Sequence, residues 1–98
     1  MALIRLIKSV AKALTGKKGL SELEVMEARP KRYQQKLVDG GGLHLLVHSD
    51  GLKEWAMDYY FEGKKMTLPI GEYPDVTLTS ARFRRDQAIN DLAKGLIP

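Results

Sequence analysis

The residues best suited to chemistry in this 98-residue sequence are two histidines, a glycine triplet and scattered carboxylates. His44 and His48 are four residues apart, which puts both on one face of a strand but about 13 Å apart along its axis. A metal site needs a third ligand, and the sequence has neither a cysteine nor an HExxH motif. We therefore expect both histidines to face solvent and predict no metal site.

The glycine triplet at 40–42 follows Asp39 and resembles a phosphate-binding loop only superficially. Neither GxGxxG spacing nor a Walker lysine accompanies it, so we predict a plain turn. The acids fall at predicted turns or on the polar face of a strand, where solvation is expected rather than an acid–base pair; they are Asp39, Asp50, Asp58 and Glu62. No catalytic residue and no cofactor are predicted.

The elements that would position these residues are three strands with two-residue alternation, at 43–47, 55–61 and 66–70. Glycine-containing turns separate them, which predicts an antiparallel meander with one apolar and one polar face. Residues 33–38 leave room for a short extra strand. Because Pro69 has no backbone donor, its strand is expected at a sheet edge, or with the proline facing outward.

Two helices complete the predicted α+β fold, a three-stranded antiparallel β-meander packed against a C-terminal α-helix, with a short N-terminal helix. Ser21 and Glu24 have capping-box spacing, and Pro30 ends that helix. Thr77 or Thr79 caps the last helix, which covers the apolar face of the sheet. Its inward side is predicted to hold Leu78, Ala81, Arg85, Ala88, Ile89 and Leu92.

The net charge of +4 is concentrated in one segment. Residues 1–20 hold five basic residues and no acid, so residues 21–98 sum to −1. With no cysteine and 44% hydrophobic residues, the chain has the composition of one small domain with a modest core. Such a core argues against a large enclosed active site. The net positive charge is typical of a protein that binds nucleic acid, but it does not indicate that the sheet is the binding surface.

Residues 1–20 are predicted to be a basic amphipathic segment and a flexible joint ahead of a domain at 21–98. Apolar residues recur at helical spacing over 2–14, and Gly16–Gly19 interrupts the pattern. Charges every three or four residues exclude a signal peptide or a membrane span. Three roles stay open for 2–14: packing on the domain, gripping DNA as a basic tail, and binding an anionic membrane.

The stretch LVDGGGLHLLV at 37–47 resembles the sDGGGLyLlV segment of the N-terminal arm-type DNA-binding domain of phage and genomic-island tyrosine integrases. Lys53, Trp55, the Gly63-Lys64 turn and TLPIGEYPDVTLTSAR at 67–82 also match the pattern of that family. The tail LAKGLIP at 92–98 is similar to its lakGiDP, with Ile97 in place of aspartate. The resemblance covers about residues 20–98.

This resemblance implies binding of double-stranded DNA at arm-type sites that flank an attachment site, with the outer face of the sheet in the major groove. The implied outward contacts are His44, His48, Lys53, Tyr60, Lys64, Lys65 and Thr67. Lys64 and Lys65 would meet phosphates, and Tyr60, Thr67 and His44 would reach base edges. Many relatives are basic where this chain has Ala56, Asp58 and Tyr60. Asp58 suits that position only if it accepts from a cytosine amino group or pairs with a neighbouring lysine.

The resemblance also implies that the chain is an excised, non-enzymatic part of an integrase. Recombinase catalysis needs a nucleophilic tyrosine with arginine, lysine and histidine or tryptophan helpers in a separate downstream domain, and no tyrosine here has an HxxR-like companion. A bacterial cytoplasmic location at the nucleoid is expected. The alternative is a protein-interaction module for other integrase protomers or accessory factors, with weak or no DNA binding, which the acidic middle of the chain favours.

Overall fold

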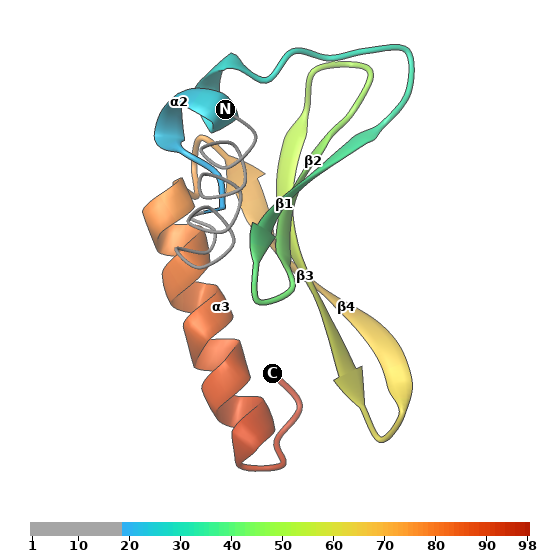
Figure 1. Cartoon of the computed structure of the whole chain (residues 1–98), viewed down its shortest axis with the longest axis vertical. Coiled ribbons are helices and arrows are strands. Elements are labelled where there is room, and N and C mark those ends of the chain that lie inside the picture. Colours follow the sequence, from blue (N-terminus) through green and yellow to red (C-terminus); the bar gives the residue numbers. More distant parts are fainter. Residues whose placement is uncertain (1–18) are drawn as a thin grey trace, which may run out of the picture.

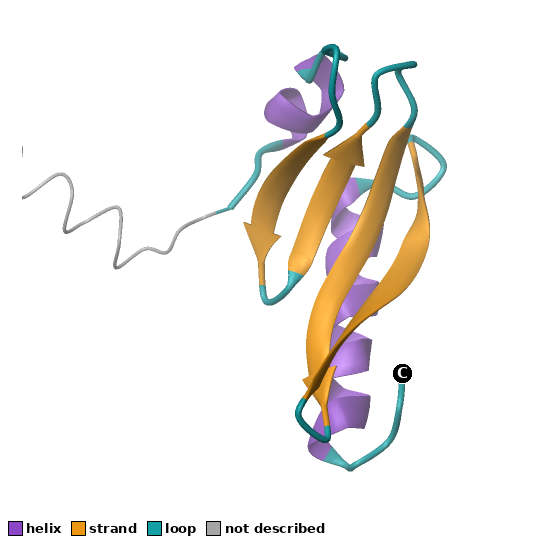
Figure 2. Ribbon diagram, turned by 90° about the vertical axis from the view of Figure 1, so that its right-hand side faces the viewer, coloured by secondary structure: helices purple, strands orange, loops and turns teal. Residues whose placement is uncertain are grey.

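A computed structural model describes residues 19–98, and the helix predicted at 2–14 lies outside these residues. A short helix is followed by four strands and a long helix, which lies across one face of the sheet (Figures 1 and 2). The elements are α2 (Glu22–Glu27), β1 (Gln35–Gly40), β2 (Leu43–Val47), β3 (Lys53–Phe61), β4 (Lys64–Tyr73) and α3 (Leu78–Ala93).

The sheet is an antiparallel meander in the order β1-β2-β3-β4. The predicted extra strand is therefore a full member of the sheet, two residues later than expected. Pro69 lies on β4 at an edge, as its missing donor requires. Beside it, β4 has a bulge, because Trp55 pairs with Gly71 while Ala56 pairs with Pro69. The predicted α+β fold is confirmed.

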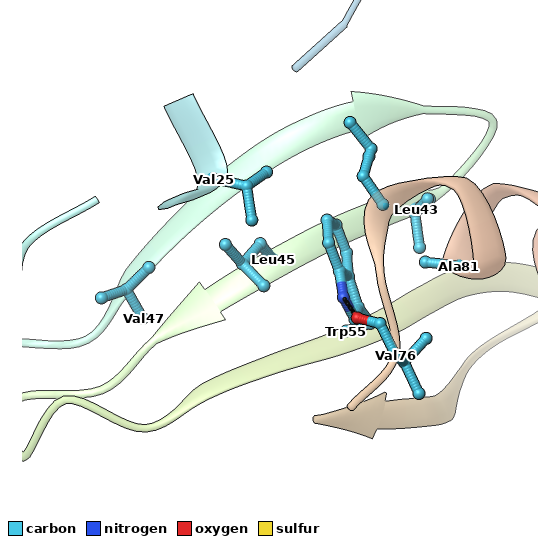
Figure 3. Close-up of a cluster of buried hydrophobic side chains, with 8 residues drawn as sticks. Val25, Leu43, Leu45, Val47, Trp55, Val76 and Ala81 are labelled. Carbon is cyan, nitrogen blue, oxygen red and sulfur yellow. Dashed lines mark hydrogen bonds between the residues drawn. The ribbon is translucent and has the colours of Figure 1, made fainter. Parts of the chain in front are cut away.

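The core lies between the sheet and the two helices. Trp55 is 1% exposed, and its indole Nε1 donates to Val76 O at 2.8 Å. Around it, buried side chains from α2, β2, the β4–α3 connection and α3 form one cluster (Figure 3): Val25, Leu43, Leu45, Val47, Val76, Leu78 and Ala81. A second cluster of Met57, Tyr59 and Ala88 continues the core along α3. These contacts fix which sheet face is covered and which is free.

Both helix starts have the predicted caps. Ser21 and Glu24 form a capping box, and Thr77, rather than Thr79, accepts from Ser80 N at the start of α3. The buried positions of α3 are Leu78, Ala81 and Ala88, as predicted. Ile89 was predicted to face inward and is 44% exposed, because it lies beyond the edge of the buried stripe.

Candidate nucleic-acid interface

The sheet face turned away from α3 carries the polar residues of alternate strand positions. Directly opposed residues in an antiparallel pair project to the same face, so the register defines this set. We call it the outer face: Lys36, Val38, His44, Leu46, Glu54, Ala56, Asp58, Tyr60, Lys65, Thr67, Pro69 and Glu72. Neither of the two helices in the described residues covers it (Figure 2).

Asp58 is the centre of a polar cluster on the outer face. Its carboxylate accepts from Lys36 Nζ at 2.8 Å and Thr67 Oγ1 at 2.9 Å, and Lys65 Nζ lies 3.8 Å away. The hydrogen bond from Lys36 is the main cause that lowers the pKa of Asp58 below its ordinary value, so this group is ionised at neutral pH. The carboxylate is thus paired with neighbouring lysines, one of the two arrangements that the sequence left open.

Lys36 was not among the predicted contacts. It lies on β1, opposite Leu46, and its side chain is 47% exposed. The alternation of the strand predicted at 33–38 could have placed Lys36 on the outer face. Because Leu37 faces the core, its neighbour Lys36 must face the other way. Lys36, Asp58, Tyr60, Lys65 and Thr67 form what we call the outer-face cluster, in which Tyr60 is 69% exposed.

His44 was predicted to face solvent and to reach base edges, and the predicted exposure is wrong. It lies on the outer face but is only 4% exposed, with Nδ1 3.2 Å from Gly42 O and 3.9 Å from Asp58. Burial lowers the pKa of the imidazole below its ordinary value of 6.5. The ring is a support beneath the cluster rather than an exposed contact.

Lys53 and Lys64 do not lie on the outer face. Lys53 has the same strand parity as Trp55, and its Nζ donates to Val25 O at 2.7 Å and Met26 O at 3.0 Å, at the carboxyl end of α2. Lys64 is exposed but pairs with Phe61, which turns it to the face opposite Lys65. The expectation that these lysines share one face with Lys65 is therefore wrong.

His48 lies at the far end of the outer face from Tyr60. Its Nε2 is 2.7 Å from Glu54 Oε1, and its Nδ1 is 3.2 Å from Gln34 Nε2. The structure thus brings together Tyr60, Lys65 and Thr67 of the predicted contacts, and leaves His48 apart from them.

A shallow depression of about 380 Å³ lies in the outer face between these two ends. Leu46, Ala56 and Pro69 give it apolar walls, and the carboxylates of Glu54 and Glu72 flank it. Glu54 and Glu72 are directly paired across β3 and β4, and like charges in that position repel each other. The middle of the outer face therefore combines apolar and hydrogen-bond-accepting groups without a cation.

Asp39 was predicted to be a solvated surface acid, and this is wrong. Its side chain is 2% exposed and accepts from Arg82, Arg85 and Leu20 N. Burial works against ionisation, but these hydrogen bonds and the arginine charges outweigh it and lower the pKa of Asp39.

The glycine triplet is the predicted turn: Gly42 has φ +91°, and a Cβ there would lie 2.2 Å from Asp58 O.

Residues 19–98 also lack the features of two other classes of site. No group of three histidine, cysteine, aspartate or glutamate side chains is placed to hold a metal ion. No helix in this part of the chain is long and apolar enough to cross a membrane.

Comparisons with known proteins show the family of the chain. A family model described as an Arm DNA-binding domain matches residues 8–98. The chain is 37% identical over 79 residues to the integrase of Shigella phage Sf6 and 41% identical over 81 residues to the integrase of Enterobacteria phage P4. Each match covers 81% of this chain, but only 20% and 18% of those relatives. A third relative, the putative protein IntB of Escherichia coli K12, is 50% identical over 56 residues, which are 57% of the chain and 14% of that protein.

The chain belongs to the family of Arm DNA-binding domains. It spans about a fifth or less of the length of these curated relatives. It is a DNA-binding module of the integrase type, and the resemblance drawn from its motifs is confirmed.

Proposed function

We propose that this domain binds arm-type sites of double-stranded DNA through the outer face of its sheet, which enters the major groove. The observation that supports this most is the outer-face cluster, because it gathers two lysines, a threonine and an exposed tyrosine on an uncovered sheet face. A sheet face of this kind fits the major groove, where base edges can be read.

In this proposal Lys36 and Lys65 contact phosphates. Both lysine side chains are about half exposed and lie near one carboxylate, so the cluster keeps a net positive charge. Asp58 competes with phosphates for the two lysines, so it offsets part of their charge in the free domain. Phosphate contacts of this type set affinity and register but read no sequence.

The proposed base readers are Tyr60, Thr67 and the depression. The Tyr60 phenol can donate and accept hydrogen bonds, while the Thr67 hydroxyl, which donates to Asp58, can still accept; both project from the outer face. The apolar walls of the depression suit a thymine methyl group, while Glu54 and Glu72 can accept from a cytosine amino group. These contacts would give sequence preference where the lysines give none.

The second candidate function is a protein-interaction module. It is favoured by the paired carboxylates of Glu54 and Glu72, which repel phosphates that approach this end of the outer face. Under that alternative, other integrase protomers or accessory factors would cover the face. For the whole protein we propose a site-specific recombinase of phage or prophage type that acts on DNA in the bacterial cytoplasm.

Titration of the chain against duplex DNA tests the proposal. We would select a duplex from a random-sequence pool and compare it with a scrambled duplex of equal composition at several salt concentrations. The proposal expects tighter binding of the selected duplex and an affinity for both that falls linearly on a log–log plot against salt. Absence of binding to both duplexes at low salt would leave the protein-interaction alternative.

A further inference from the structure

A second group of cations lies outside the outer-face cluster, in the connection between α2 and β1. Arg29, Lys31 and Arg32 are exposed, and Tyr33 beside them is 64% exposed. Among residues 19–98, none of the three cations forms an ion pair. Since residues 21–98 together carry −1, three unpaired cations in four positions are a strong local excess of charge.

Hydrogen bonds hold this connection across the start of β1. Gln35 has the parity of the covered face, because it pairs with buried Val47, and its Nε2 donates to Arg29 O at 2.8 Å. On the outer side, Gln34 Nε2 lies 3.2 Å from the His48 ring, which itself contacts Glu54. Glu54 belongs to the outer face, so the chain of contacts joins the connection to one end of that face. In Figure 1 the α2–β1 connection and the β3–β4 hairpin both extend to the side of the sheet away from α3.

The charges along the outer face therefore alternate in a simple order. The cations of the connection are at one end, next to the acidic and apolar depression. Lys36 lies in the row of Leu46 and Glu54, at the level of the depression, but its Nζ and that of Lys65 gather at Asp58, toward the other end. From Glu54 to Tyr60, β3 spans about 20 Å, which exceeds the ~12 Å width of the major groove. A DNA duplex has a matching arrangement, with a negatively charged phosphate backbone on each side of the groove and the base edges between them.

We infer that residues 29–33 form a second phosphate contact, which grips one DNA backbone while Lys36 and Lys65 meet the other. This inference rests on the proposed function and deepens it. The arrangement explains why an acidic depression is compatible with DNA: it lies over base edges, and cations are kept at the two ends where phosphates lie. His48 then has a positioning role, because it ties Gln34 to Glu54.

The test is the salt dependence of binding by a triple variant, Arg29→Ala, Lys31→Ala and Arg32→Ala, in the full chain. The selected and scrambled duplexes are the probes. Each phosphate contact that is removed lowers the slope of log affinity against log salt by about 0.9, so the slope should become shallower by about 2 to 3 for both duplexes. Unfolding curves should match those of the unmodified chain, since the three side chains are exposed.

A matched pair separates position from net charge. Lys31→Glu and Lys94→Glu change the total charge equally, but Lys94 follows α3, on the covered side of the sheet. Lys31→Glu should weaken binding strongly and Lys94→Glu much less. An unchanged slope in the triple variant, or equal losses in the matched pair, would overturn the inference while leaving the proposed function intact. If the unmodified chain binds neither duplex, both fall.

Discussion

Arg82 on α3 holds Asp39 on β1 through two hydrogen bonds, from Nε to Oδ2 at 2.9 Å and from Nη2 to Oδ1 at 2.7 Å. The same guanidinium donates to Leu20 O at 2.7 Å, and Leu20 N donates to Asp39. A planar guanidinium matched to a carboxylate is a strong, directional pairing. It joins the β1–β2 turn, the approach to α2 and the first turns of α3, and thus fixes the sheet against its covering helix.

Replacing Asp39 should therefore cost stability. Asp39→Ala leaves Arg82 and the partly buried Arg85 without their carboxylate, and loss of one partner of a buried pair costs about 3 kcal/mol or more. Chemical denaturation would measure the change in the free energy of unfolding. Asp86→Ala is the control, because the Arg85–Asp86 pair has a carboxylate that is 65% exposed and should contribute about 0–1 kcal/mol. Equal losses in the two variants would refute this role of Asp39.

Stability should fall as the solution becomes acidic, and His44 should begin the fall. The folded state lowers the pKa of His44 below 6.5, so the unfolded chain binds this proton more tightly and stability drops as pH decreases through 6.5. The charges near His44 are Asp58, Lys36 and Lys65. Asp39 and Asp58, with lowered pKa values, add a further loss below 3.8. The melting temperature between pH 7 and pH 5 measures the histidine effect.

His44→Gln should reduce the fall in melting temperature between pH 7 and pH 5, because the buried ring beneath Asp58, with its lowered pKa, is lost. If the His44 variant keeps the full dependence, another group is responsible.

Neutralising Asp58 should raise affinity for DNA of any sequence. Asp58→Asn removes the carboxylate that attracts Lys36 and Lys65, so both cations become more available to phosphates. The salt slope should steepen by up to about one for each additional phosphate that a lysine reaches. Asp86→Asn makes the same change of charge on α3 and should have little effect. Weaker binding of the scrambled duplex by the Asp58 variant would contradict the proposed phosphate contacts.

Adjacent lysines provide a test of which sheet face meets DNA. Lys65→Ala should weaken binding of the selected and scrambled duplexes similarly and lower the salt slope by about one, because a phosphate contact is lost. Lys64→Ala should have a much smaller effect, since Lys64 projects to the other face. Tyr60→Ala should instead reduce the preference for the selected duplex. A larger loss with Lys64 than with Lys65 would mean that DNA does not meet the outer face.

Removal of residues 1–18 should reduce sequence-independent affinity. This segment holds five basic residues and no acid, and we propose that it adds electrostatic attraction to the DNA phosphates. The truncated chain keeps Leu20, which contacts Asp39 and Arg82, and its unfolding curve serves as the control for folding. Affinity for the scrambled duplex and its salt slope are the measurements; an unchanged slope would exclude a contribution from the segment.

Much of the fold follows from local signals. Two-residue alternation located the strands, Ser21 with Glu24 marked the start of α2, and Pro69 indicated an edge strand. The same alternation would have excluded Lys53 and Lys64 from the outer face, because Lys53 shares its parity with Trp55 and Lys64 with Met66. The family pattern placed both there because it records residue types along the chain and not strand parity.

The sequence by itself determined the order of elements, the family and the polar face of each strand, because these depend on local spacing and on a linear pattern of motifs. Only the tertiary structure decided the environments of Asp39, His44 and Asp58. The buried carboxylate of Asp39 is paired with Arg82, 43 residues away in the sequence. The ionised carboxylate of Asp58 is paired with Lys36, 22 residues away. Charge pairing and burial depend on distances in space, which strand pairing and helix packing set. A local sequence pattern does not specify those distances.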